Sequence, residues 1–151
     1  MNSVENTMQD PEHRQPSDPN QTVILVAEDE VLIRNVARIV LESEGYFVLS
    51  ANDGEEALNI SRRYPGRIHA LVSDVSMPKT DGLQLRAQIL SERPGTKVLL
   101  MSGRAAFPAD SIPFLRKPFG PAVLKERIRQ LLDSAESEED QSQLDWPQLR
   151  L

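Results

Sequence analysis

The stretch that decides the fold runs from Ala70 to Gly82 and reads Ala-Leu-Val-Ser-Asp-Val-Ser-Met-Pro-Lys-Thr-Asp-Gly. It opens with a short apolar run and then places one carboxylate, Asp74, where that run gives way to Ser76 and a proline. This pattern predicts a buried strand that delivers an acid to the loop at its carboxyl end, the edge where open α/β sheets bind ligands. Asp74 is therefore the first candidate for a residue that does chemistry.

Segments on both sides of this stretch alternate between strand and helix patterns. Strands are predicted at residues 22–27, 46–51, 68–73, 97–101 and 112–115, and helices from Val31 to about Gly45, from Asp53 to Tyr64, from Asp81 to Arg93 and from about Pro118 to Asp133. The apolar positions at helical spacing are Leu32, Val36, Ile39 and Val40 in the first helix, Ala57, Ile60 and Tyr64 in the second, Leu83, Ala87 and Leu90 in the third, and Leu124, Ile128, Leu131 and Leu132 in the last.

Polar residues that can do chemistry follow each of four predicted strands. Strands that alternate with helices at this spacing predict an α/β fold, a doubly wound parallel sheet with helices on both faces. Right-handed crossovers place the carboxyl ends of all strands on one edge. We therefore expect five residues to converge there, namely Glu28, Asp29, Asp74, Ser102 and Lys117. Asp53 and Asp81, by contrast, are interpreted as helix caps.

Acidic side chains at a shared edge repel one another unless a cation lies among them. Mg²⁺ suits one or two carboxylates with water and phosphate oxygens, so Asp29 and Asp74 are predicted as direct ligands, with Mn²⁺ as an alternative ion, and Glu28 as a ligand through water. Lys117 and the hydroxyl of Ser102 can each bond a phosphoryl oxygen. An aspartate that attacks phosphorus needs a metal and a lysine, so Asp74 is predicted to be a phosphoacceptor.

Four pieces of sequence at these strand ends resemble the receiver domain of bacterial two-component response regulators. They are Val-Ala-Glu-Asp-Glu at 26–30, Leu-Val-Ser-Asp-Val-Ser-Met-Pro-Lys-Thr-Asp-Gly at 71–82, Leu-Leu-Met-Ser-Gly at 99–103 and Phe-Leu-Arg-Lys-Pro-Phe at 114–119. One acid pair or one Lys-Pro would be a weak signal, but four pieces in the right order are a strong one. The resemblance covers about residues 21–133.

The resemblance implies a flavodoxin-like fold with five strands in the order 2-1-3-4-5. It also implies dependence on Mg²⁺ and phosphotransfer to Asp74 from a sensor histidine kinase or a histidine phosphotransfer protein. By position, it assigns Glu28 and Asp29 to the acidic pocket and the backbone carbonyl of Ser76 to the metal.

The resemblance assigns the remaining roles to residues near the fourth and fifth strands. Lys117 corresponds to the phosphoryl contact, Ser102 to the switch hydroxyl and Phe114 to the switch aromatic. A cis peptide between Lys117 and Pro118 is also implied, since proline makes the cis form accessible.

One segment departs from the family pattern. Ser102 and Lys117 are separated by a stretch in which residues 103–112 contain Pro108 and leave no room for a helix of ordinary length. The helix that the family places between its fourth and fifth strands is therefore predicted to be missing or reduced to one turn.

The net negative charge of the chain lies in its two ends. The 151 residues carry a formal charge of −6 and contain no cysteine, which excludes disulfides and thiolate metal sites. Residues 1–20 and 134–151 are polar and acidic and are predicted to be tails, the first disordered, around a single receiver domain at 21–133. No apolar run is long enough for a spanning helix, so a cytoplasmic protein is expected.

The sequence thus predicts a stand-alone receiver, phosphorylated on Asp74, that signals through protein contacts with a target that the sequence does not identify. Direct DNA binding and membrane binding are not expected. It is not expected to be an enzyme, only a phosphoacceptor with Mg²⁺-dependent self-phosphorylation and self-dephosphorylation. Two alternatives remain open: a phosphatase or phosphotransferase of the aspartyl-phosphate type, against which Ser76 argues because a second acid is usual there, and an interaction module that works without phosphorylation.

Overall fold

The computed structural model describes residues 15–103 and 112–134 of the chain. Its helices and strands are β1 Val23–Ala27, α2 Val31–Ser43, β2 Phe47–Ala51, α3 Gly54–Arg63, β3 Ala70–Asp74, α4 Gly82–Glu92, β4 Lys97–Ser102, β5 Phe114–Arg116 and α5 Pro121–Asp133. Residues 1–14 and 135–151, most of the two predicted tails, lie outside the described residues, and so do residues 104–111, where the shortened helix is predicted.

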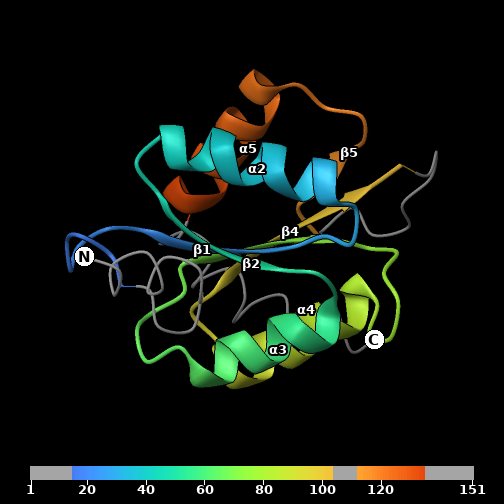
Figure 1. The fold of residues 1–151 in the computed structure, drawn as a ribbon, viewed down its shortest axis with the longest axis horizontal. Coiled ribbons are helices and arrows are strands. Elements are labelled where there is room, and N and C mark those ends of the chain that lie inside the picture. Colours follow the sequence, from blue (N-terminus) through green and yellow to red (C-terminus); the bar gives the residue numbers. More distant parts are fainter. Residues whose placement is uncertain (1–14, 104–111, 135–151) are drawn as a thin grey trace, which may run out of the picture.

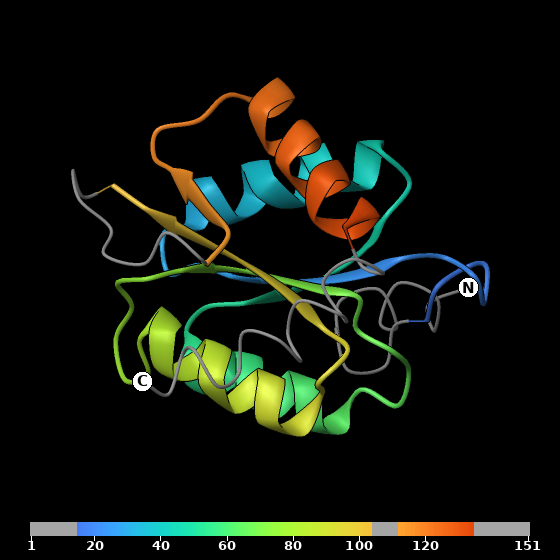
Figure 2. The ribbon, with the colours of Figure 1, turned by 180° about the vertical axis from the view of Figure 1, so that it is seen from behind.

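The five strands form one parallel sheet in the order β2-β1-β3-β4-β5. The doubly wound α/β class and the strand order are therefore confirmed. Helices α2 and α5 cover one face of the sheet and α3 and α4 cover the other (Figure 1), and the same two layers are visible from behind (Figure 2). Because all strands run in one direction, their carboxyl ends share one edge.

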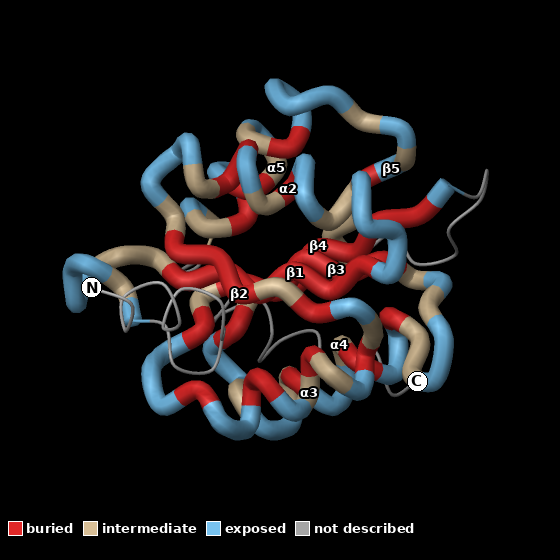
Figure 3. Tube along the Cα trace, in the orientation of Figure 1, coloured by how far each residue is buried: buried red, intermediate tan, exposed pale blue. Residues whose placement is uncertain are grey.

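Apolar side chains are buried on both faces of the sheet, and the central strands are the most buried part of the molecule (Figure 3). In β1, alternate residues belong to different cores: Ile24 and Val26 pack with α2 and α5, whereas Leu25 packs with α3 and α4. A strand covered on both faces needs apolar residues at every position, which is why β1 reads as a continuous apolar run. The two cores hold the strand ends in place.

Of the four apolar residues that indicate helix α2, only Val40 faces the sheet. Val40 is buried together with Ala37 and Leu41, but Leu32 is 80% exposed and Ile39 is 57% exposed. The helix therefore carries two apolar stripes, and only one of them packs against the core.

In α4, as in α2, the apolar residues used to predict the helix mostly differ from the buried ones, whereas in α5 they agree. Leu85 and Ile89 are the large buried side chains of α4, whereas Leu83, from the apolar set used to predict the helix, is exposed. In α5, which begins at Pro121 rather than at Pro118, the residues predicted to face inward do so: Leu124, Ile128 and Leu131 are buried and Leu132 packs at the edge of the core.

Both predicted helix caps are confirmed. The side chain of Asp53 accepts a hydrogen bond of 2.8 Å from the backbone N–H of Glu56, at the start of α3. Asp81 accepts one of 2.8 Å from Gln84, whose own side chain accepts from the Asp81 N–H. These carboxylates satisfy amides that the helix itself leaves unpaired, so they start helices.

Within the part of the chain that the structure describes, the helices are too short or too polar to cross a membrane.

Candidate functional site

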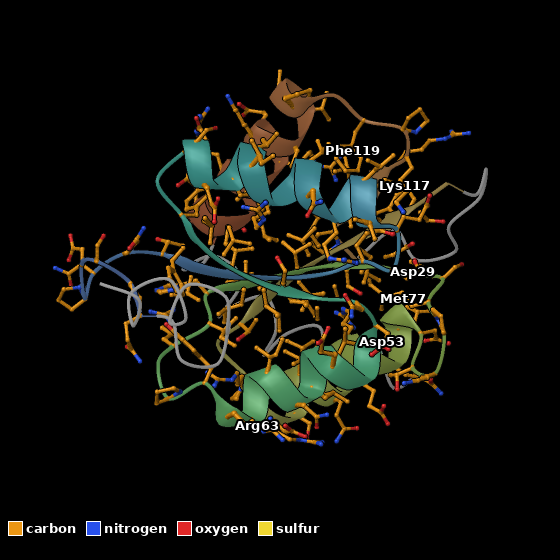
Figure 4. The ribbon with its side chains drawn as sticks, in the orientation of Figure 1. Asp29, Asp53, Arg63, Met77, Lys117 and Phe119 are labelled. Carbon is orange, nitrogen blue, oxygen red and sulfur yellow. The ribbon has the colours of Figure 1, made fainter. Side chains whose placement is uncertain are left out.

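The carboxyl edge of the sheet brings together side chains from three strand ends. Glu28 and Asp29 follow β1, Asp74 ends β3, and Lys117 follows β5 directly after Arg116. Figure 4 shows Asp29 and Lys117 on the same side of the molecule, although 88 positions separate them in the sequence. The convergence expected from the parallel topology is therefore present.

Lys117 lies between two carboxylates. Its ammonium nitrogen is 2.7 Å from Oε1 of Glu28 and 3.0 Å from Oδ2 of Asp74. Glu28 is fully buried and Asp74 is 7% exposed, so both contacts are shielded from solvent. In such surroundings the attraction between opposite charges is stronger than at an exposed surface, and the three side chains act as one electrostatic unit.

Hydrogen bonds from the start of α2 also hold Glu28. Its Oε2 accepts from the backbone N–H of Glu30 at 3.1 Å, and its carbonyl oxygen accepts from the guanidinium of Arg34 at 2.8 Å. Burial raises the pKa of the Glu28 carboxyl above its ordinary value, although the bonds from Lys117 and Glu30 favour the charged form. Both oxygens of Glu28 are thus engaged by protein groups. The contribution of Arg34 was not predicted, since nothing in its spacing distinguishes it from an ordinary exposed helix residue.

The ammonium of Lys117 stays protonated. Burial on its own would lower the pKa of this group, but the hydrogen bonds to Glu28 and Asp74 outweigh burial and raise the pKa above its ordinary value. A permanent positive charge therefore lies beside the proposed attacking carboxylate.

The chemistry of the donors fits a hard divalent ion. Glu28, Asp29 and Asp74 each offer a carboxylate oxygen, and these oxygens lie within 4.8 Å of one another. Asp29 is exposed whereas the other two are buried, so an ion would enter from the Asp29 side with part of its water shell. Carboxylate and water oxygens are the ligands that Mg²⁺ prefers in proteins, so these residues could hold Mg²⁺.

The loop after β3 carries the predicted carbonyl ligand. The backbone N–H of Ser76 donates to Oδ1 of Asp74 at 3.3 Å, and the N–H of Gly82 donates to the carbonyl of Val75 at 2.8 Å. A Cβ atom on Gly82 would lie 2.3 Å from the carbonyl oxygen of Asp74, so this close approach requires glycine. The sequence Asp81-Gly82 thus both caps α4 and lets it start against the end of β3.

The two predicted switch residues lie on neighbouring strands, Ser102 on β4 and Phe114 on β5. Ser102 is buried at the end of β4, and its carbonyl accepts from the N–H of Lys117 at 2.8 Å, so it adjoins the site through the backbone. Phe114 is half-buried at the start of β5, three residues before Lys117, and its carbonyl accepts from the guanidinium of Arg127. The peptide between Lys117 and Pro118 is cis, as predicted.

The chain matches the family model of the response regulator receiver domain over residues 24–129. It is 32% identical over 123 residues to the transcriptional regulatory protein ResD of Bacillus subtilis, in an alignment that covers 77% of this chain and 50% of ResD. The chain therefore spans about half the length of that relative.

Solved structures agree with the family match. The receiver domain of the hybrid histidine kinase CckA is 40% identical, with a TM-score of 0.61, over 73% of this chain and 98% of the other. The response regulator TrrA of Thermotoga maritima, solved in complex with Mg²⁺ and BeF, is 29% identical, with a TM-score of 0.65, over 74% of this chain and all of the other. Taken with the acids and the lysine at the carboxyl edge of a 2-1-3-4-5 sheet, these matches show that the chain belongs to the response regulator receiver family.

Proposed function

We propose that this receiver accepts a phosphoryl group on Asp74 in a reaction that depends on Mg²⁺. The observation that carries the proposal is the position of the Lys117 ammonium, 2.7 Å from Glu28 and 3.0 Å from Asp74, beside a third carboxylate. Asp74 thus lies at a strand end beside the ammonium of Lys117, with carboxylate oxygens of Glu28 and Asp29 nearby. Phosphoryl transfer needs little more from a protein than this positioning and charge.

In the proposed reaction a carboxylate oxygen of Asp74 attacks phosphorus, a new O–P bond forms, and the bond from phosphorus to the donor breaks. Lys117 then moves its hydrogen bond from Asp74 to a phosphoryl oxygen and neutralises charge there. Asp29 and Asp74 would hold Mg²⁺ directly, together with the backbone carbonyl of Ser76, and Glu28 would act through water. The ion, when bound, would supply positive charge for the phosphoryl oxygens.

The donor would be a histidine kinase or a histidine phosphotransfer protein, since receiver domains act with such kinases. Ser102 would donate its hydroxyl to the phosphoryl group, and the loop that follows would shift between two populations, with Phe114 following it. A protein partner would bind one of the two conformations in preference to the other. The chemistry would be limited to the phosphorylation and dephosphorylation of Asp74 itself, since Ser76 stands where an aspartyl-phosphate phosphatase needs a second acid.

Incubation with acetyl phosphate and Mg²⁺, followed by intact mass spectrometry, tests the proposal. We expect a phosphoryl adduct on the wild type and none on Asp74→Asn. Asp81→Asn is a matched control, because asparagine still caps α4 and that carboxylate lies outside the cluster, so it should be labelled like the wild type. Absence of the adduct from the wild type, or an equal adduct on Asp74→Asn, would refute the proposal.

A further inference from the structure

The first turn of α3 lies directly against the loop of residues 75–81. A Cβ atom placed on Gly54 would be 2.4 Å from the carbonyl oxygen of Thr80 and 2.7 Å from its Cβ. Distances this short are not tolerated between non-bonded atoms, so only glycine allows the helix and the loop to approach each other in this way. Gly54 therefore fixes the separation between α3 and the loop.

Lys79, in the same loop, also contacts the start of α3. Its ammonium lies 3.2 Å from Oε1 of Glu55 and 3.7 Å from Oδ2 of Asp53, the cap of α3. The hydrogen bond to Glu55, followed by the charges of Glu55 and Asp53, raises the pKa of Lys79 above its ordinary value. Two acids at the start of one helix thus attract one lysine of the loop.

The backbone at Lys79 needs such support. Its φ of 71° lies in the left-handed region, which is unfavourable for a residue with a side chain and persists only when the surroundings hold it. Only Met77 and Pro78 separate Lys79 from Ser76, and the ring of Pro78 stiffens this short connection. Lys79 is therefore joined to Ser76 by two residues only, one of them restricted in φ.

Both ends of the loop lie against Asp74, since the N–H of Ser76 donates to its side chain and Gly82 packs on its carbonyl oxygen. Figure 4 shows Asp53, Met77 and Asp29 along one side of the molecule, so the start of α3, the loop and the acidic pocket are neighbours in space. The loop is thus attached to Asp74 at both ends, and its residues Lys79 and Thr80 lie against α3.

We infer that Gly54 and Lys79 are positioning residues for the metal site: by holding the loop against α3 they set the place of the Ser76 carbonyl and so the affinity for Mg²⁺, without touching the ion. The inference rests on the proposed function, since it takes the carbonyl of Ser76 as a ligand. It adds to that function two residues, Gly54 on α3 and Lys79 in the loop, that lie outside the cluster of Glu28, Asp29, Asp74 and Lys117.

A titration of the full chain with Mg²⁺, followed by the backbone amide NMR signals of Val75 and Ser76, tests the inference without any phosphoryl donor. Lys79→Gln removes the charge and keeps most of the stem, and we expect its Kd for Mg²⁺ to rise roughly two- to fivefold, the range for loss of an exposed ion pair. Lys79→Arg should restore the wild-type Kd. Lys125→Gln is the control, because Lys125 forms a partly exposed ion pair, 3.8 Å from Glu44, on α5 and away from the loop.

Gly54→Ala tests the close contact itself. The added methyl group must displace either the loop or the helix, so we expect Mg²⁺ to bind more weakly by a factor on the order of ten. Gly95→Ala is its control, since a Cβ atom at Gly95 would meet no atom within 4 Å, and it should leave the Kd unchanged. Should Gly54→Ala not fold, the pair Lys79→Gln and Lys79→Arg decides the question alone.

Unchanged Mg²⁺ affinity in Lys79→Gln, or equal losses in Lys79→Gln and Lys79→Arg, would overturn the inference and leave the proposed function standing. Wild-type amide signals that do not respond to Mg²⁺ would overturn both. If the variants bind Mg²⁺ as expected and the wild type nevertheless takes no phosphoryl group on Asp74, the proposed function fails and the role of Gly54 and Lys79 in metal binding holds.

Discussion

The ammonium of Lys117 lies 3.0 Å from a carboxylate oxygen of Asp74, and this ion pair joins the loop after β5 to the end of β3 across the intervening strand β4. With Glu28 on its other side, Lys117 is the counter-charge for two buried acids. Removal of one partner from a buried ion pair leaves the other charge uncompensated, which is the costly way to break such a pair.

We therefore expect Lys117→Met to lower the free energy of unfolding by about 2–4 kcal/mol. Urea unfolding without Mg²⁺ measures this change. Lys125→Met is the control, because an exposed pair contributes at most about 1 kcal/mol. A loss in Lys117→Met no larger than that in the control would show that the carboxylates do not depend on this lysine.

Mg²⁺ should stabilise the folded chain because the ligand oxygens are assembled only in the native state. Mass action predicts about 2.7 kcal/mol of added stability once Mg²⁺ reaches 100 times its Kd. Thermal unfolding at increasing Mg²⁺ concentration measures the rise in Tm, and Asp29→Asn should lose most of it. A rise in Tm that is the same in Asp29→Asn as in the wild type would exclude Asp29 as a ligand.

His69 should make stability depend on pH near neutrality. Its Nδ1 accepts a 3.0 Å hydrogen bond from the N–H of Val23, and burial, with Arg67 nearby, lowers the pKa of His69 below its ordinary 6.5. As the pH falls, His69 therefore takes up a proton at a higher pH in the unfolded chain than in the folded chain. The stability that neutral His69 contributes is complete above pH 6.5 and is lost as the pH falls below that value, by up to about 1.4 kcal/mol per pH unit.

His69→Asn tests this prediction, since an amide oxygen can still accept from Val23 but does not titrate. Urea unfolding at about pH 7.5 and about pH 5.5 should give a smaller difference for the variant than for the wild type. If the change in stability between the two pH values were the same in His69→Asn and in the wild type, His69 would have the same pKa in the folded and unfolded chains.

Gly82 should tolerate no side chain. A Cβ atom there would lie 2.3 Å from the Asp74 carbonyl oxygen and 2.7 Å from the Cα atom of Val75, both of which are backbone atoms that cannot rotate away. Gly82→Ala should cost about 1–3 kcal/mol of stability and should also slow labelling of Asp74, because the strand end must move. Circular dichroism melts and the acetyl phosphate assay measure the two effects. Stability and labelling equal to those of Gly95→Ala would contradict this account.

Arg93 should be essential for holding the end of α4 against the end of α3. Its guanidinium donates to the Ser61 hydroxyl at 2.9 Å and to three carbonyl oxygens, those of Ser61 and Tyr64 at 2.7 Å and that of Gly66 at 2.9 Å. Arg93→Met leaves these carbonyls without their donor, and we expect a loss of about 2–4 kcal/mol in urea unfolding. Arg93→Lys should restore little of it, because one ammonium cannot span the four acceptors. Full rescue by lysine would show that charge alone matters.

Much of the site could be predicted because its residues lie where strands end. The positions of Asp29, Asp74 and Lys117 follow from three apolar runs and from the rule that parallel strands share a carboxyl edge. The caps Asp53 and Asp81 were equally predictable, since a carboxylate three residues before a helix amide is a local arrangement.

The contacts that depend on three-dimensional packing could not be predicted. Both apolar stripes of α2 have helical spacing, so the sequence alone does not tell that Leu32 faces solvent and Ala37 faces the sheet. The same holds for the bond from Arg34 to Glu28 and for the ion pairs of Lys79, which join groups on different elements. Such contacts follow from tertiary packing and leave no local pattern in the chain.

The strand that leads into Lys117 is the shortest of those described. β5 has three residues, pairs with β4 alone, and is further held by the bond from Arg127 to Phe114. Short edge segments open locally at a small fraction of the free energy of global unfolding, so its amides should exchange with deuterated water far sooner than those of β1. The acids of the site thus follow central strands of the sheet, whereas their cation follows its shortest edge strand, which we expect to open first.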